Sequence, residues 1–269
     1  MAKEPSNAIY PPNGWQLKFA VNKILKNLDF EFMDLEILPN SLRAVLRDIL
    51  EVGNGAPFRH YYQWTSQSVY EYAIKNNIKE IVELGAGCAP ITRHLIQNFP
   101  NWKISFKITD LNPDIVNFKI LEKKDNRVQA VFESVDFSKK LKGFENSLLV
   151  LSATFHHIEE KQKATILKNL KTISPHVLIF EPLRPTMPSF LFVMGAIVSG
   201  LLTPLFRINS KSFFRCFLWC WLLPIAPLMF LWDGWISAWR CWGLKKWQIQ
   251  EPKSIIKESL FCTQVLIVR

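Results

Sequence analysis

Two acidic residues and two glycines mark the stretch in which residue type and spacing best suit chemistry. Glu83, Gly85 and Gly87 lie at the end of one apolar run, and Asp110 follows the next apolar run, about twenty residues later. Glycine adopts unusual backbone angles and lets a ligand approach the main chain closely. An acidic residue at the tip of a second strand can accept hydrogen bonds from a ribose diol. The pattern predicts a site for a nucleotide-type cofactor.

Two details of this turn separate the cofactor classes. Pro90 stands where the dinucleotide fingerprint G-x-G-x-x-G/A has glycine or alanine. Proline suits the first turn of a helix but not the close strand–helix contact that the third glycine serves. Glu83 would repel a pyrophosphate, whereas it suits a ligand with a cationic amino group. An NAD(P)-linked oxidoreductase would share the fold and stays an alternative, although these details disfavour it.

With these residues the turn resembles the first motif of the class I S-adenosylmethionine (SAM)-dependent methyltransferases, E/D-x-G-x-G-x-G. Glu83, Gly85 and Gly87 match that motif, and Ala89 replaces its third glycine. In the family an acidic residue after the third strand often contacts the adenine, with an apolar neighbour against the ring; a surface turn is the alternative here. The resemblance implies SAM as the cofactor and this binding set: Glu83, Gly85, Ala86, Gly87, Asp110, Leu111, Asp136, Phe137 and Ser152.

Strand-like and helix-like segments alternate around the turn. The predicted strands are 81–84, 104–108, 128–135, 147–152 and 177–180, with helices over 91–99, 112–124 and 161–173, and two last strands at 246–249 and 261–268. This order predicts an α/β, Rossmann-like, seven-stranded and mostly parallel sheet with helices on both faces. Ligands bind at the carboxyl ends of such strands. We therefore expect one rim to carry Gly85, Asp110, Asp136, His156 and Glu181.

Two adjacent histidines are the candidates for proton transfer. Methyl transfer from a sulfonium is an in-line displacement that depends mostly on positioning, and a base is needed only if the acceptor must lose a proton. His156 and His157 follow the fourth predicted strand, and Glu181 can orient a histidine or the substrate. The alternative is that the histidines only pack against the cofactor. The 5 cysteines form no CxxC pair or His/Cys metal spacing, so we expect no metal and reduced, cytosolic thiols.

The composition points to an anionic partner and an apolar surface. Hydrophobic residues make up 49% of the 269-residue chain and charged residues 21%, which excludes a disordered chain. The net charge is +10, which suits an anionic partner such as a membrane surface, a nucleic acid or an acidic ligand. Nucleic acid is the unlikely partner, because no N/D-P-P-Y/F/W element follows the fourth strand and the late chain is rich in aromatic residues.

Two uncharged stretches lie late in the chain, between Arg184 and Arg207 and between Arg215 and Asp233. The first is long enough to span a bilayer, for which ~20 residues suffice. The loop between them carries Arg207, Lys211 and Arg215 with no acid, which disfavours its translocation. We expect a monotopic, interfacial or re-entrant insertion with its basic loop on anionic headgroups. A spanning hairpin and a soluble roof over an apolar pocket stay open.

A short polar element follows these stretches. Asp233, Gly234, Ser237 and Arg240 resemble the D-G-x-x-S-x-x-R element of a little-characterised, membrane-associated branch of class I methyltransferases. At helical spacing Asp233, Ser237 and Arg240 share one face, which predicts a substrate-side polar cluster. A helix cap with a surface salt bridge is the alternative reading.

The predicted organisation has four parts. Residues 1–55 form an N-terminal arm and helical lid, 56–183 the SAM-binding core, 184–244 the apolar membrane-interacting insertion, and 245–269 the last two strands. Helices cluster in 15–51, the second after Asn40-Ser41, and Gly53-Asn54-Gly55-Ala56-Pro57 should break the pattern. By the family resemblance Tyr61, Tyr62 and Trp64 line a substrate entrance, although aromatic packing is the alternative.

The resemblance and the apolar stretches together imply a methyltransferase at a membrane face. Its acceptor would be a hydrophobic or lipid-like small molecule, its catalytic domain would lie in the cytoplasm, and 185–239 would hold one or two transmembrane or re-entrant helices. A membrane-anchored, non-catalytic SAM- or nucleotide-binding protein is a further alternative.

Overall fold

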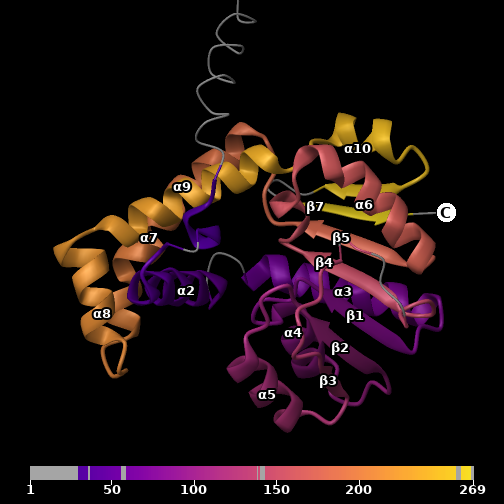
Figure 1. Ribbon diagram of the computed structural model, residues 1–269, viewed down its shortest axis with the longest axis horizontal. Coiled ribbons are helices and arrows are strands. Elements are labelled where there is room, and N and C mark those ends of the chain that lie inside the picture. Colours follow the sequence, from indigo (N-terminus) through magenta and orange to yellow (C-terminus); the bar gives the residue numbers. More distant parts are fainter. Residues whose placement is uncertain are drawn as a thin grey trace, which may run out of the picture.

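A computed structural model describes residues 30–35, 37–55, 59–137, 139, 143–258 and 262–267. The predicted N-terminal arm and the first predicted helix lie outside the described residues. The centre of the molecule is a seven-stranded sheet in the order β3-β2-β1-β4-β5-β7-β6 (Figure 1). Its strands are β1 (Glu80–Leu84), β2 (Ser105–Thr109), β3 (Val128–Ala130), β4 (Leu148–Ser152), β5 (Val177–Glu181), β6 (Ile255–Glu258) and β7 (Thr263–Ile267).

The first five strands are parallel, and the last two reverse the direction. β7 pairs antiparallel with β5, and β6 pairs antiparallel with β7. β4 and β5 are buried along their whole length, as expected for central strands covered on both faces. The predicted α/β fold with a mostly parallel seven-stranded sheet is confirmed.

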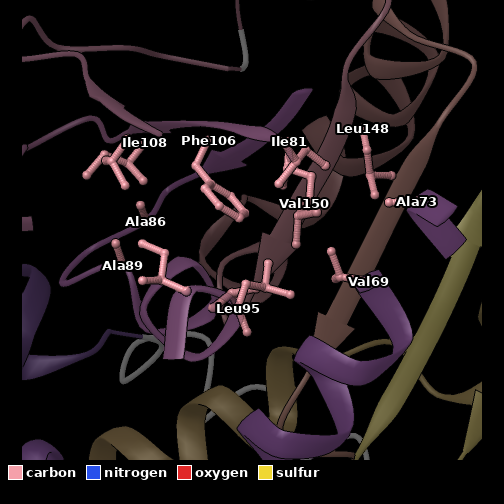
Figure 2. Packing of buried hydrophobic residues seen from close by; sticks show 14 of the residues in the cluster. Val69, Ala73, Ile81, Ala86, Ala89, Leu95, Phe106, Ile108, Leu148 and Val150 are labelled. Carbon is pink, nitrogen blue, oxygen red and sulfur yellow. The ribbon is translucent and has the colours of Figure 1, made fainter. Parts of the chain in front are cut away.

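Helices cover both faces of this sheet. One face carries α3 (Arg59–Lys75), α4 (Pro90–Asn98) and α5 (Ile115–Lys124), which pack on β1, β2 and β4. Figure 2 shows part of that core, where Val69 and Leu95 from the helices meet Phe106 and Val150 from the strands. The other face carries α6 (Glu160–Ile173) and α10 (Leu244–Gln250).

A second group of helices lies beside the sheet and forms what we call the helical lobe (Figure 1). It comprises α2 (Asn40–Gly55), α7 (Met187–Phe206), α8 (Phe213–Phe217), the π-helical turn η3 (Leu218–Leu222) and α9 (Ile225–Arg240). Leu46 and Ile49 of α2 are fully buried against Cys216, Cys220 and Ala226 of the lobe. The described part of the predicted lid therefore packs in the lobe.

Three predicted element boundaries are wrong. Residues 246–249, predicted as a strand, lie in the helix α10. Trp247 and Ile249 alternate with polar residues as in a strand, but only Trp247 is buried, and Ile249 is 75% exposed. β3 ends at Ala130, where the chain turns back toward β2 and the Val135 amide donates to the Asp110 carbonyl. The helix α2 extends to Gly55, into the stretch 53–57 where the sequence predicted a break; residues 56 and 57 lie outside the described residues.

Candidate active site

The glycine turn after β1 has the backbone that its residues predict. Gly85 has φ +65°, and a Cβ on it would lie 2.3 Å from Cγ2 of Thr154, so the position admits no side chain. Gly87 has φ +54° and no atom within 4 Å of where a Cβ would stand. Ala89, in place of the family's third glycine, also has a left-handed backbone, with φ 55°. The turn thus brings bare main chain to an open space at the rim of the sheet.

Glu83 lies below this turn and caps the helix that follows it. Its carboxylate accepts hydrogen bonds from the amides of Ile91 (3.3 Å) and Thr92 (3.0 Å) and from the Thr92 hydroxyl (2.6 Å). The carboxylate is buried, and this burial raises its pKa to about 7 against the lowering effect of these hydrogen bonds. Contact with the amino group of a ligand was expected, but these bonds direct Glu83 to the N-terminus of α4.

Asp110, at the tip of β2, connects the two halves of the rim. One carboxylate oxygen accepts a hydrogen bond from the Gly87 amide (2.7 Å), and the other accepts one from the Asn112 amide (2.8 Å). Asp110 therefore fixes the conformation of the glycine turn from the neighbouring strand. It also lies at the wall of an open cleft, where a ribose would pass.

That cleft, the first cavity, has a volume of about 530 Å³. Of the predicted cofactor residues, the structure brings Gly85, Gly87, Asp110, Leu111, Asp136 and Phe137 to its wall. Thr154, Glu159 and Gln162 complete its polar side, and sequence reasoning missed them. The described lining contains neither lysine nor arginine, so the polar part of the cleft is acidic.

A second cavity of about 410 Å³ continues from the first. The two share Gly87, Asp110, Ala153 and His157, which form the junction between them. Ala153 has φ 53°, a left-handed backbone that is uncommon for alanine and is found at functional sites. Beyond the junction, Glu31 and Met33 and the helices α7 and α9 form much of the wall. Its apolar side chains are Met33, Leu50, Leu183, Phe192, Val193 and Phe230.

The two histidines have different surroundings. His156 is buried, and its Nδ1 lies 2.5 Å from Oε2 of Glu181, whose Oε1 accepts the His156 amide at 3.1 Å. Burial opposes ionisation of Glu181, but the charge and hydrogen bond of His156 prevail and lower its pKa. His157 is 39% exposed at the junction, and its Nδ1 lies 3.6 Å from Oε2 of Glu31. His156 is fixed by a buried partner, whereas His157 is presented to both cavities.

Glu31 belongs to a segment, residues 30–35, that crosses α9 and that we call the strap. Glu31 is only 4% exposed, and Oε1 accepts hydrogen bonds from Oγ of Ser237 (3.1 Å) and Nη1 of Arg240 (3.3 Å). Sequence reasoning missed Glu31, since nothing local marks it; only the fold brings it to His157. The strap thus places a buried carboxylate at the polar end of the second cavity.

The D-G-x-x-S-x-x-R element is the anchor of this strap. Asp233 accepts hydrogen bonds from the amides of Phe32 (2.6 Å) and Met33 (3.2 Å). A Cβ on Gly234 would lie 2.6 Å from Cγ1 of Val193, so this glycine lets α9 approach α7 closely. Ser237 and Arg240 donate hydrogen bonds to Glu31, so each of the four motif residues takes part in a structural contact. Asp233 and Ser237 also line the second cavity, as a substrate-side cluster would; the Arg240 guanidinium lies behind Glu31.

Four other predicted residues lie in the core. Ser152 Oγ is 2.9 Å from the Tyr61 hydroxyl, and Tyr61 also donates to the Phe180 carbonyl (3.2 Å). Burial raises the pKa of both Tyr61 and Tyr62, so the phenols stay neutral. Tyr62 stacks on His94, and Trp64 packs edge-on against Phe180. These four residues are absent from the linings of the two cavities, which favours the aromatic-packing alternative.

Two groups of side chains have metal-ligating atoms within 4.8 Å of one another: Glu31, His156 and His157, and His156, Glu181 and Cys241. The linear spacing of the cysteines gave no sign of either group. Each group already forms hydrogen bonds: His156 with Glu181, Glu31 with Arg240, and Cys241 with Glu181. The arrangement is that of a hydrogen-bonded network, and the absence of a metal stays a prediction.

The helical lobe exposes an apolar surface. The helix α7 is long and apolar enough to cross a membrane, and α8 with η3 forms with α9 a pair bent by 78°. By length and composition alone, the described residues hold one candidate span, or two if the bent pair counts as one. Arg207 and Arg215, expected on headgroups, pair with Asp48 of α2 at 3.1 and 2.6 Å, and their contact with headgroups stays a prediction. Lys211 between them is exposed.

No protein-family model and no curated protein matches the chain. Among solved structures, the plantazolicin methyltransferase BpumL in complex with a monoazolic desmethylPZN analog and SAH aligns with 93% of this chain and 100% of its own, at 11% identity and a TM-score of 0.51. BpumL in complex with SAH aligns over the same shares at 12% identity and a TM-score of 0.49. An O-methyltransferase family protein from Burkholderia thailandensis aligns over 79% of this chain and 57% of its own, at 10% identity and a TM-score of 0.48. The first of these likenesses shows a shared fold.

Proposed function

We propose that this chain is a SAM-dependent methyltransferase that acts on a hydrophobic or lipid-like acceptor at a membrane face. The observation that carries the proposal is the junction of the two cavities at Gly87, Asp110, Ala153 and His157. The first cavity has Gly85, Asp136 and Glu159 in its wall, and the second has apolar walls with carboxylates at its polar end. A cofactor and an acceptor could meet only there, as transfer between two bound molecules requires.

The residues of the first cavity fit SAM. When bound, SAM supplies an electrophilic methyl group on a positively charged sulfonium. Asp110 would hold the ribose hydroxyls, Asp136 and Phe137 the adenine, and the open space at Gly87 the amino-acid end. The acidic lining suits a cationic ligand, because carboxylates stabilise a positive charge in a partly enclosed cleft.

The same residues disfavour a dinucleotide. A pyrophosphate binds at a helix N-terminus through free amides. At the N-terminus of α4 the amides of Ile91 and Thr92 are bound to the Glu83 carboxylate. The described lining of the first cavity also offers no lysine or arginine to a phosphate.

The membrane part of the proposal rests on the surface of the lobe. A run of large apolar side chains is exposed along α7, α8, η3 and α9: Leu191, Met194, Val198, Leu201, Leu202, Leu205, Phe206, Phe214, Trp221, Leu222, Ile225 and Leu228. Exposed apolar surface of this extent marks an interaction site in soluble proteins. The lobe also walls the second cavity, so a bilayer at this surface would adjoin the acceptor site.

Thermal unfolding with ligands tests the cofactor assignment. We expect S-adenosylhomocysteine to raise the Tm of the full chain and NADH to leave it unchanged, because only a ligand of the native state shifts unfolding. Stabilisation by NADH alone would favour the oxidoreductase.

Flotation with anionic liposomes tests the membrane assignment. We expect the variant Leu201→Ser/Leu205→Ser to float less than the wild type, because it removes exposed apolar side chains of α7. The matched control is Val116→Ser/Ile120→Ser, which changes exposed apolar residues of α5, a helix that packs on the sheet. Equal loss in both variants, or in neither, would refute the role of the lobe.

A further inference from the structure

We propose that the acceptor has an apolar body and a head that donates a hydrogen bond and carries no negative charge, a hydroxyl or an amine, and that Glu31 of the strap binds this head. The inference rests on the proposed function, in that it assigns the second cavity to the acceptor. It adds the chemical class of the head and a binding residue outside the Rossmann-like core.

The charges around the second cavity exclude an anionic head. Its described lining includes the carboxylates of Glu31, Asp110 and Asp233, and it contains neither lysine nor arginine. Asp110 and Asp233 already accept hydrogen bonds from backbone amides, and both add negative potential to the cavity. A carboxylate or phosphate head would enter beside three acids, because the Arg240 guanidinium bonds Glu31 Oε1 and is not part of the described lining.

Glu31 is the carboxylate that faces the head. Ser237 and Arg240 hold Oε1 and fix the side chain in place. Oε2 points to the other side, where His157 Nδ1 lies 3.6 Å away, beyond hydrogen-bond distance. A hydroxyl or ammonium placed between Glu31 and the junction would donate to Oε2, and a charge-assisted bond of this kind fixes the orientation of the ligand.

The apolar body of the acceptor would lie along Met33, Phe192, Val193 and Phe230. Met33 belongs to the strap, two residues after Glu31, so one segment contributes both to the head site and to the apolar wall. A volume of about 410 Å³ is in the range of pockets that bind small molecules.

The position of the head also accounts for proton removal at the junction. The oxygen or nitrogen of the head forms its bond to the methyl carbon as the carbon–sulfur bond breaks, and that electron pair stays on sulfur. The proton of the head would pass to the imidazole of His157, which lines both cavities. Atoms and charge balance without a further reactant.

Three soluble probes with one apolar body test the class of head: 4-phenylbutanol, 4-phenylbutylamine and 4-phenylbutyrate. Binding to the full chain is measured by calorimetry without any cofactor. We expect the alcohol and the amine to bind about tenfold tighter than the acid or better, a difference of about 1.4 kcal/mol. In Glu31→Gln this preference should fall to about threefold or less, whereas Glu31→Asp, which keeps the charge, and Glu71→Gln, an exposed control on α3, should retain it.

Equal affinity of the wild type for the acid and the alcohol, or no binding of the alcohol and the amine, would overturn the inference. An unchanged preference in Glu31→Gln would overturn the role of Glu31. The proposed function fails by a different result, the absence of a thermal shift with S-adenosylhomocysteine in the same preparation, so the two failures are distinguishable.

Discussion

The carboxylate of Asp233 accepts a hydrogen bond of 2.6 Å from the main chain of Phe32, 201 positions earlier in the sequence. A second bond, from the Met33 amide, engages its other oxygen. Arg43 of α2 holds the same segment from the other side, through the carbonyls of Met33 (2.8 Å) and Leu35 (2.5 Å). The strap is therefore fixed at both edges, although it has no place in the sheet.

Asp233→Ala should release the strap. Two part-buried amides would lose their acceptor, at a cost of about 1–3 kcal/mol in the local opening free energy. Hydrogen exchange at Phe32 and Met33 should accelerate about tenfold or more, while exchange in β4 stays at the wild-type rate. The matched control is Asp114→Ala, which removes a carboxylate that accepts the Asn117 amide at the start of α5. Fast exchange in the strap of the control as well would show that the effect is not local.

Gly85→Ala and Gly87→Ala should differ in cost although the two glycines have similar φ. A left-handed alanine costs about 1 kcal/mol at either position. At Gly85 the new methyl group would also overlap Thr154 at 2.3 Å, which adds about 2 kcal/mol. Denaturant unfolding should therefore show the larger loss of stability in Gly85→Ala. Equal losses would mean that Thr154 does not press on the turn.

Glu83 should make stability fall as the pH rises. Its folded pKa of about 7 exceeds the unfolded value of 4.5, so the native state binds more protons between these values. The stabilisation is fully present below pH 4.5 and lost as the pH rises through 7, a change of about 3 kcal/mol. Unfolding of the wild type and Glu83→Gln at pH 5 and pH 8 checks this, because the variant should lack the Glu83 contribution to the difference. A wild-type slope retained in full by the variant would assign it to other groups.

Glu181 should act in the opposite direction. The charge of His156 lowers its folded pKa below 4.5, so its contribution is present above pH 4.5 and lost as the pH falls through the folded pKa. Glu181→Gln should lower the free energy of unfolding by about 2 kcal/mol at neutral pH, because it weakens the buried hydrogen bond between His156 and the charged carboxylate. Acid unfolding should then be less steep in the variant. An unchanged acid limb would show that the pair does not govern acid stability.

The sheet could be predicted from the sequence because its signals are local. The apolar runs that form β1, β4 and β5 are short and bounded by glycine, polar or proline residues. Gly85 and Gly87 predict the turn after β1 by themselves. The convergence of Gly85, Asp110 and Asp136 at one rim follows from parallel strand order alone, and the first cavity shows it.

What the sequence could not show depends on contacts between distant segments. Glu31 looks like one acid among several in its stretch, and only the fold places it against Ser237 and Arg240 of α9. Glu83 matches a ligand-binding motif, but only the structure shows that its carboxylate accepts hydrogen bonds from two amides of α4. The arginines of the apolar insertion looked available for headgroups, because their partner Asp48 lies on a helix far away in sequence.

We expect the first cavity to bind SAM through the rim of the sheet. Titration calorimetry of SAM into the full chain and into Asp110→Ala tests this most directly. One molecule of SAM should bind per wild-type chain, and the affinity should weaken about tenfold or more in the variant, because Asp110 both meets the ribose and holds the Gly87 amide at 2.7 Å. A wild-type protein that gives no heat with SAM, or an Asp110→Ala variant that binds SAM as tightly as the wild type, would contradict it.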